Sequence, residues 1–135
     1  MSEPNSMANF LDEIEQTRTG LTFNRLRNIN RDRCTEWHAD GSTDWSAADW
    51  GNALAGEVGE LCNVIKKYRR IQTGVDNPDV DEQSVEVLLA QIRDELADVQ
   101  CYLDLTADFF NIDLGDATID KFNRVSEKRG YSQRL

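Results

Sequence analysis

Apolar residues recur at helical spacing along most of the chain. Leu21, Leu26, Ile29 and Trp37 fall on one face of a helix that ends near Trp37. The polar, turn-forming residues 39–44 ("ADGSTD") then predict a loop. Few segments show the strict alternation of apolar and polar residues that marks a half-buried strand. The pattern therefore predicts a mainly helical chain.

Two long helices are expected next. Ser46 is a good N-cap and Asp49 approximates a capping box, so a helix is predicted over 47–72, with Gly74 as its stop signal. Residues 73–83 are polar and turn-rich and predict a long loop. A second long helix is expected over 83–110 and a last one over 114–128, ended by Gly130. The predicted fold class is all-α, a bundle of four helices with two of them long.

The length of 135 residues fits a single domain, predicted over 21–135. Residues 1–20 are polar and acidic and predict a weakly structured N-terminal extension. The hydrophobic fraction of 39% is enough for one core. Aromatic stripes exceed what one small four-helix unit needs, so at least a homodimer is expected; they include Tyr102, Phe109, Phe110 and Phe122.

Charge and composition exclude several function classes. The formal net charge of -10 disfavours binding to a nucleic-acid backbone or to an anionic membrane surface. No apolar run approaches the length of a membrane-spanning helix, and the start does not resemble a secretory signal. The three cysteines show no CxxC spacing. A cytoplasmic protein is therefore expected. His38 is the only histidine, which argues against zinc and iron sites that use several histidines.

The two long helices each place a carboxylate within their apolar stripe. At about 100° per residue, Glu57 lies in the middle of the stripe of the first helix, and Glu60 lies about 60° away at its edge. Glu95 is central in the second helix in the same way, with Asp98 at the edge. Packing the two stripes together would bring four acids into one place.

Four close carboxylates repel each other unless a cation neutralises them. Neither stripe offers a basic partner, and oxygen ligands suit Mg²⁺ or Mn²⁺. A single acid pair at this spacing is commonly just a solvated helix face, but two pairs in matched phase on buried stripes favour a metal centre. We therefore predict that Glu57, Glu60, Glu95 and Asp98 are metal ligands.

The sequence segments around these acids resemble those of a known family. "WGNALAGEVGELCNVIKK", "RDELADVQCYLDLTADFFNIDL" and "IDKFNRVSEKRGY" are similar to the MazG-like all-α nucleotide pyrophosphohydrolases, over about residues 21–131. The family motif is EExxE, a spacer, then ExxD. Gly56 stands where the motif has its first Glu. The other four acids of the motif are present, as Glu57, Glu60, Glu95 and Asp98, and the spacer between the two pairs is long for the family.

The resemblance implies an enzyme that converts a nucleoside triphosphate to its monophosphate and pyrophosphate. The four acids would be catalytic and would hold two or three Mg²⁺, with Glu60 also orienting or deprotonating the attacking water. The word "RNINRDRCTEWH" looks most like small phage-borne members, which would work in the host cytoplasm. A preference for dGTP and GTP, as in the MazZ subgroup, is one alternative within this class, and dUTPase is another. The family also implies a dimer of dimers.

Substrate contacts are expected at five further residues. Lys67 lies seven residues after Glu60 and so near the same helix face. Lys121 and Asn123 match a family word that contacts phosphate or sugar. Asn30 has the hydrogen-bonding groups to recognise a base, and Trp37 the ring to stack on one. Each lysine alone is as readily a solvated charge.

A second class of function stays open at this point. The same acids would also suit a non-catalytic helical module that binds a structural divalent ion or a protein partner. A structural site fills its coordination shell with protein ligands, whereas a catalytic site keeps open positions for substrate and water.

Overall fold

The computed structural model of the chain describes residues 20–75 and 84–135, in which all regular secondary structure is helical, with no strand in these ranges. Four α-helices and one short 3₁₀ turn follow one another: α2 (Phe23–Trp37), η1 (Gly41–Asp44), α3 (Ala47–Thr73), α4 (Val85–Phe109) and α5 (Leu114–Arg129). The all-α prediction is confirmed. The predicted extension, except for residue 20, and most of the predicted loop lie outside the described residues.

Local sequence signals set the helix ends. The Ser46 hydroxyl accepts from the Asp49 amide, and the Asp49 carboxylate accepts from the Ser46 amide, so the capping box of α3 is complete. Gly74 ends α3 and Gly130 ends α5, with φ of 64° and 70°, a left-handed backbone that glycine adopts without steric cost. These predicted starts and stops are confirmed.

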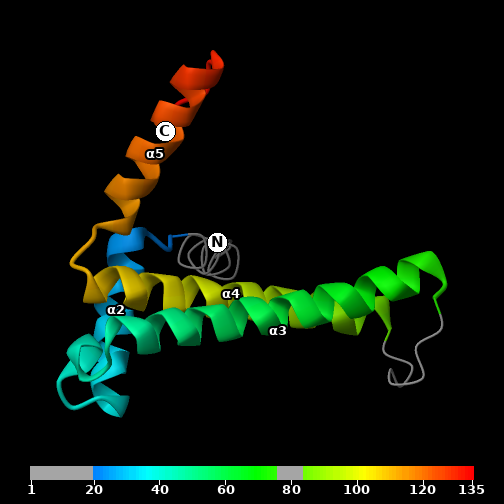
Figure 1. The fold of residues 1–135 in the computed structure, drawn as a ribbon, viewed down its shortest axis with the longest axis horizontal. Helices are drawn as coiled ribbons and strands as arrows, with labels where there is room; N and C mark the ends of the chain where they lie inside the picture. Colours follow the sequence, from blue (N-terminus) through cyan, green and yellow to red (C-terminus); the bar gives the residue numbers. More distant parts are fainter. Residues whose placement is uncertain (1–19, 76–83) are drawn as a thin grey trace, which may run out of the picture.

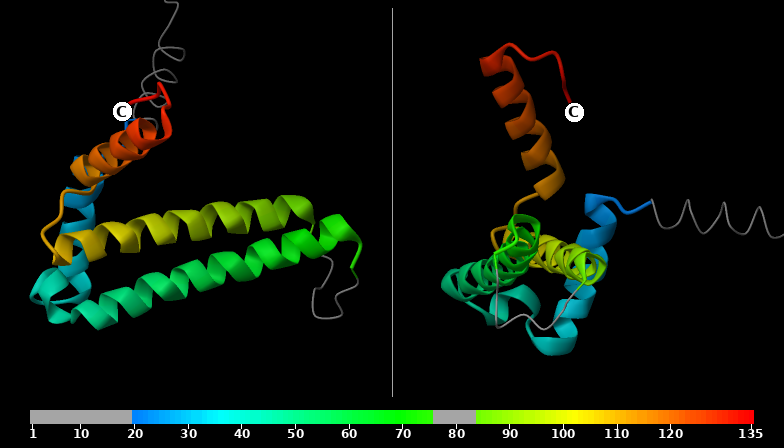
Figure 2. Two further views of the ribbon diagram at one scale, coloured as in Figure 1. Left: turned by 45° about the horizontal axis from the view of Figure 1, so that its top comes forward. Right: turned by 90° about the vertical axis from the view of Figure 1, so that its right-hand side faces the viewer.

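The two long helices form an antiparallel hairpin. Helices α3 and α4 share the most extensive contact of the described structure, and Figure 1 shows them side by side along nearly their full lengths. Helix α2 crosses the end of the hairpin where α3 begins and α4 ends (Figures 1 and 2). Helix α5 projects from that end, away from the hairpin axis. Among the described helices, none combines the length and apolarity needed to cross a membrane.

A small core lies where α2, η1, α3 and α4 meet. Cys34, Trp50 and Leu105 are each 1% exposed, and the half-buried rings of Trp45, Tyr102 and Phe109 pack against them. The Trp50 indole Nε1 donates to the Ser42 carbonyl at 2.7 Å, so the buried ring leaves no donor unsatisfied.

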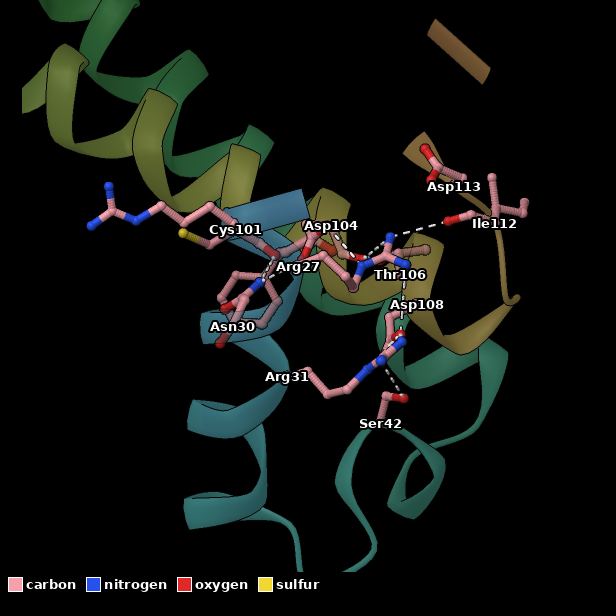
Figure 3. Close-up of polar contacts among 12 residues, drawn as sticks. Arg27, Asn30, Arg31, Ser42, Cys101, Asp104, Thr106, Asp108, Ile112 and Asp113 are labelled. Carbon is pink, nitrogen blue, oxygen red and sulfur yellow. Dashed lines mark hydrogen bonds and ion pairs between the residues drawn. The ribbon is translucent and has the colours of Figure 1, made fainter. Parts of the chain in front are cut away.

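A polar network joins α2 to the end of α4 beside this core (Figure 3). The Arg27 Nε donates to the buried Asp104 carboxylate at 2.9 Å, and its Nη2 donates to the Ile112 carbonyl at 3.1 Å. Arg31 pairs with Asp108, whose other oxygen accepts from the Ser42 hydroxyl at 3.0 Å. These contacts fix the angle at which α2 crosses the hairpin.

Candidate metal centre

Three carboxylates converge at the seam of the hairpin. One carboxylate oxygen each from Glu57 and Glu60 on α3 and from Glu95 on α4 lies within 4.8 Å of the other two. Glu57 and Glu95 are half-buried between the helices, and Glu60 is exposed. The placement of Glu57 and Glu95 in the packed stripes, with Glu60 at the edge, is as the helical spacing predicted.

Asp98 lies outside this group of three but remains within electrostatic reach. It is exposed on α4, three residues after Glu95. Its charge contributes to a raised pKa at Glu57, so the four predicted acids form one electrostatic unit although only three converge.

The neighbouring acids destabilise the charged form of Glu57. Partial burial raises the pKa of Glu57, and the negative charges of Asp98, Glu60 and Glu95 raise it further. Among the described residues, none of these four acids forms an ion pair with a basic side chain. A cation held by the carboxylates would remove this repulsion.

This donor set fits a hard divalent cation. Three carboxylate oxygens at this spacing suit Mg²⁺ or Mn²⁺, which take oxygen ligands and keep water in the remaining positions. Because Glu60 is exposed, one side of the group faces solvent. An ion held by these carboxylates would therefore be open to water on that side.

Tyr102 connects these acids to α2. Its pKa is raised by burial first and then by the charges of Glu57 and Asp98, while the charge of Arg33 lowers it. Tyr102 therefore lies within electrostatic reach both of the hairpin acids and of a cation of α2.

Arg33 is a candidate site residue that sequence reasoning did not select. Its Nη2 donates to the Asn30 Oδ1 at 3.0 Å, and its guanidinium carbon lies 5.2 Å from the centroid of the Trp37 ring. Trp37 is 54% exposed, so its ring is free to stack on a further planar group. The signal was available, because Asn30, Arg33 and Trp37 recur at three- and four-residue spacing on one side of a helix.

Asn30 has partners other than the expected base. The side chain is 2% exposed, its Nδ2 donates to the Cys101 carbonyl at 2.8 Å and to Asp104 Oδ2 at 3.1 Å, and its Oδ1 accepts from Arg33. All of its hydrogen-bonding groups are thus engaged within the chain. In this arrangement Asn30 links Arg33 to α4.

The predicted phosphate-binding residues lie in two separate places. Lys67 is half-buried on α3, ten residues after Glu57 and on the acidic hairpin. Lys121 is exposed on α5, and the Asn123 side chain bonds the backbone of Leu135 at 2.9 and 3.3 Å. Because α5 projects away from the hairpin, the structure does not bring Lys121 and Asn123 to the acids of the same chain (Figure 1).

The fold and this site define a helical-hairpin protein with an acidic cluster at the hairpin seam. No protein-family model, curated protein or solved structure matches the chain.

Proposed function

We propose that the protein is a Mg²⁺-dependent nucleoside triphosphate pyrophosphohydrolase of the MazG-like type, releasing a nucleoside monophosphate and pyrophosphate. The observation that carries the proposal is the convergence of Glu57, Glu60 and Glu95 from two helices whose sequence words resemble that family. Bound Mg²⁺ would neutralise phosphate oxygens and lower the pKa of a coordinated water.

The acids have different parts in this proposal. Glu57 and Glu95 are half-buried between the helices and would hold the ion in a fixed place. Glu60 is exposed at the edge, where its carboxylate would orient the attacking water and accept its proton. Asp98 would complete the ligand set from α4, for two or three ions in all.

Cationic and aromatic groups around the acids would bind the rest of the substrate. Arg33 and Lys67 are the cations that we assign to phosphate oxygens. The charge of Arg33 affects the pKa of Tyr102, as the charge of Glu57 does, and Lys67 lies on the same helix as Glu57. The exposed Trp37 ring, already stacked by Arg33, would stack on the base. Lys121 and Asn123 would contribute only to the site of a neighbouring copy in a homodimer or homotetramer.

Product analysis tests the proposal. The protein would be incubated with Mg²⁺ and each common NTP and dNTP, including dUTP, and the products separated by HPLC. We expect monophosphate and pyrophosphate in equal amounts. Turnover restricted to dGTP and GTP would identify a guanine preference, turnover of dUTP alone a dUTPase, and broad turnover a house-cleaning role.

Matched variants separate catalysis from folding. Glu57→Gln is expected to lower kcat by at least about 100-fold. Removing a residue that only supports a metal ligand already costs up to about 100-fold, and Glu57 would be a ligand itself. Glu86→Gln is the control, because Glu86 is exposed on the first turn of α4 and far along the helix from Glu95. Absence of turnover by folded protein with Mg²⁺ or Mn²⁺ would overturn the proposal and favour a structural ion site.

A further inference from the structure

An apolar groove lies beside the N-terminus of α2, where the first described range of the chain begins. Its volume is about 450 Å³, and it is lined by Leu21, Thr22, Phe23 and Leu26 around the start of α2 and by Gln100 of α4. Leu21 is 61% exposed and Phe23 is 43% exposed. None of the lining residues is charged, although 30% of the residues in the chain are. A groove of this size and composition suits apolar side chains of another segment.

The segment that precedes the groove in the sequence has apolar residues at helical spacing. Met7, Phe10, Leu11 and Ile14 recur at steps of three and four, the spacing of one face of a helix. At about 100° per residue they fall within an arc of about 100°, and the acids at positions 12, 13 and 15 lie outside that arc. The pattern is that of a short amphipathic helix. Such a helix is too short to be stable alone in water and needs a surface on which to pack.

We propose that residues 7–14 dock in this groove of the same chain, with their apolar face against Leu21, Phe23 and Leu26. The six residues between Ile14 and Leu21 span up to about 20 Å when extended, which is enough for the chain to reverse its direction. Gly20 is one of these six, and its lack of a Cβ permits a tight turn. The inference goes beyond the proposed catalytic function and does not depend on it.

Covalent attachment favours this occupant over a separate molecule. The segment ends at the groove itself, because Leu21 is one of the lining residues. A short flexible link holds a segment near its site at an effective concentration in the millimolar range. At an effective concentration of about 1 mM, a contact with a Kd of about 0.1 mM would leave the segment docked about ten times as often as free.

The charge beside the groove fits the acidic side of the segment. Arg25 is exposed on the first turn of α2, between the lining residues Thr22 and Leu26, and forms no ion pair among the described residues. The segment 1–19 contains four acids and one arginine. With its apolar residues in the groove, its acids can approach Arg25. An exposed pair of this kind adds little to affinity, so the apolar contacts supply most of the binding.

Hydrogen exchange of the full chain, measured by mass spectrometry, tests the contact. We expect the backbone amides of residues 7–14 to exchange about tenfold more slowly than in a free peptide of residues 1–19. Leu21→Glu places a charge in the groove and should return their exchange rate to that of the peptide. Ile29→Glu is the control, since Ile29 is 62% exposed on α2 and does not line the groove. Circular dichroism would check that both variants keep their helices.

The dependence on protein concentration identifies the occupant. Docking within one chain does not change on dilution, whereas docking on a second copy weakens. Unprotected amides in the wild type would overturn the proposal, and so would protection that falls on dilution. Protection that persists in Leu21→Glu would place the segment elsewhere, and equal loss in Ile29→Glu would show that the groove has no special part; either result would contradict the proposal.

Discussion

Arg33 has no acidic partner among the described residues, unlike Arg27 and Arg31 of the same helix. Arg27 and Arg31 are paired with Asp104 and Asp108, whereas Arg33 bonds a neutral amide and lies over the Trp37 ring. A guanidinium held in place but not neutralised is available to an anionic ligand. This is the physical basis for assigning it to substrate phosphate.

Replacing Arg33 by Gln tests this role. A charge-assisted hydrogen bond contributes about 1.5–3 kcal/mol, so KM for the triphosphate is expected to rise roughly 10- to 100-fold, with kcat changed much less. Arg25→Gln, an exposed arginine on the same helix, should leave both constants unchanged. An unaltered KM for Arg33→Gln in steady-state kinetics would remove Arg33 from the site.

At the scale of single elements, the features that the sequence predicted correctly are those that residues close together in the chain determine. The capping box at Ser46 and the glycine stops at Gly74 and Gly130 each depend on residues a few positions apart, and all three were correctly predicted. The placement of Glu57 and Glu95 was predictable for the same reason, because a regular helix fixes the direction of each side chain.

The way α2 crosses the hairpin could not be read from local pattern. Arg27 meets Asp104 across 77 residues of sequence, and neither residue belongs to a recognisable motif. Asn30 was expected to recognise a base because an amide offers both a donor and an acceptor, but the fold engages those groups inside the α2–α4 junction. The direction of α5 is likewise set by its connection and its contact with α2.

The Arg27–Asp104 pair is expected to hold α2 in place. Both side chains are largely withdrawn from water, at 16% and 1% exposed, so removing one charge leaves the other without its partner. Asp104→Asn should lower the free energy of unfolding by about 3 kcal/mol. Urea denaturation at fixed protein concentration would measure it.

The exposed Arg93–Asp94 pair of the same helix α4 is the matched control. Its side chains are 86% and 73% exposed, so water screens the interaction, and Asp94→Asn should change the free energy of unfolding by less than about 1 kcal/mol. Equal losses for the two variants would mean that the junction does not fix α2.

At the scale of the whole molecule, repulsion between negative charges destabilises the metal-free fold, and metal binding would reduce this repulsion. The net charge is -10, and three carboxylates lie within 4.8 Å in the hairpin seam. The raised pKa of Glu57 means that the folded, metal-free protein binds this proton more tightly than the unfolded chain does. The contribution of Glu57 to stability therefore falls as pH rises from its ordinary pKa of 4.5 through its raised folded value.

Thermal unfolding with and without Mg²⁺ tests this relation. Metal-free Glu57→Gln should melt a few degrees above the metal-free wild type near pH 7, and this difference should vanish at about pH 3, where the wild-type carboxyl is protonated in both states. Mg²⁺ should stabilise the wild type by about 2.7 kcal/mol at a hundred times its dissociation constant, and Glu57→Gln far less. NaCl at equal ionic strength controls for screening of the overall charge, because screening acts on both proteins alike. Equal stabilisation of both proteins by Mg²⁺ and by NaCl would show that the acids bind no ion specifically.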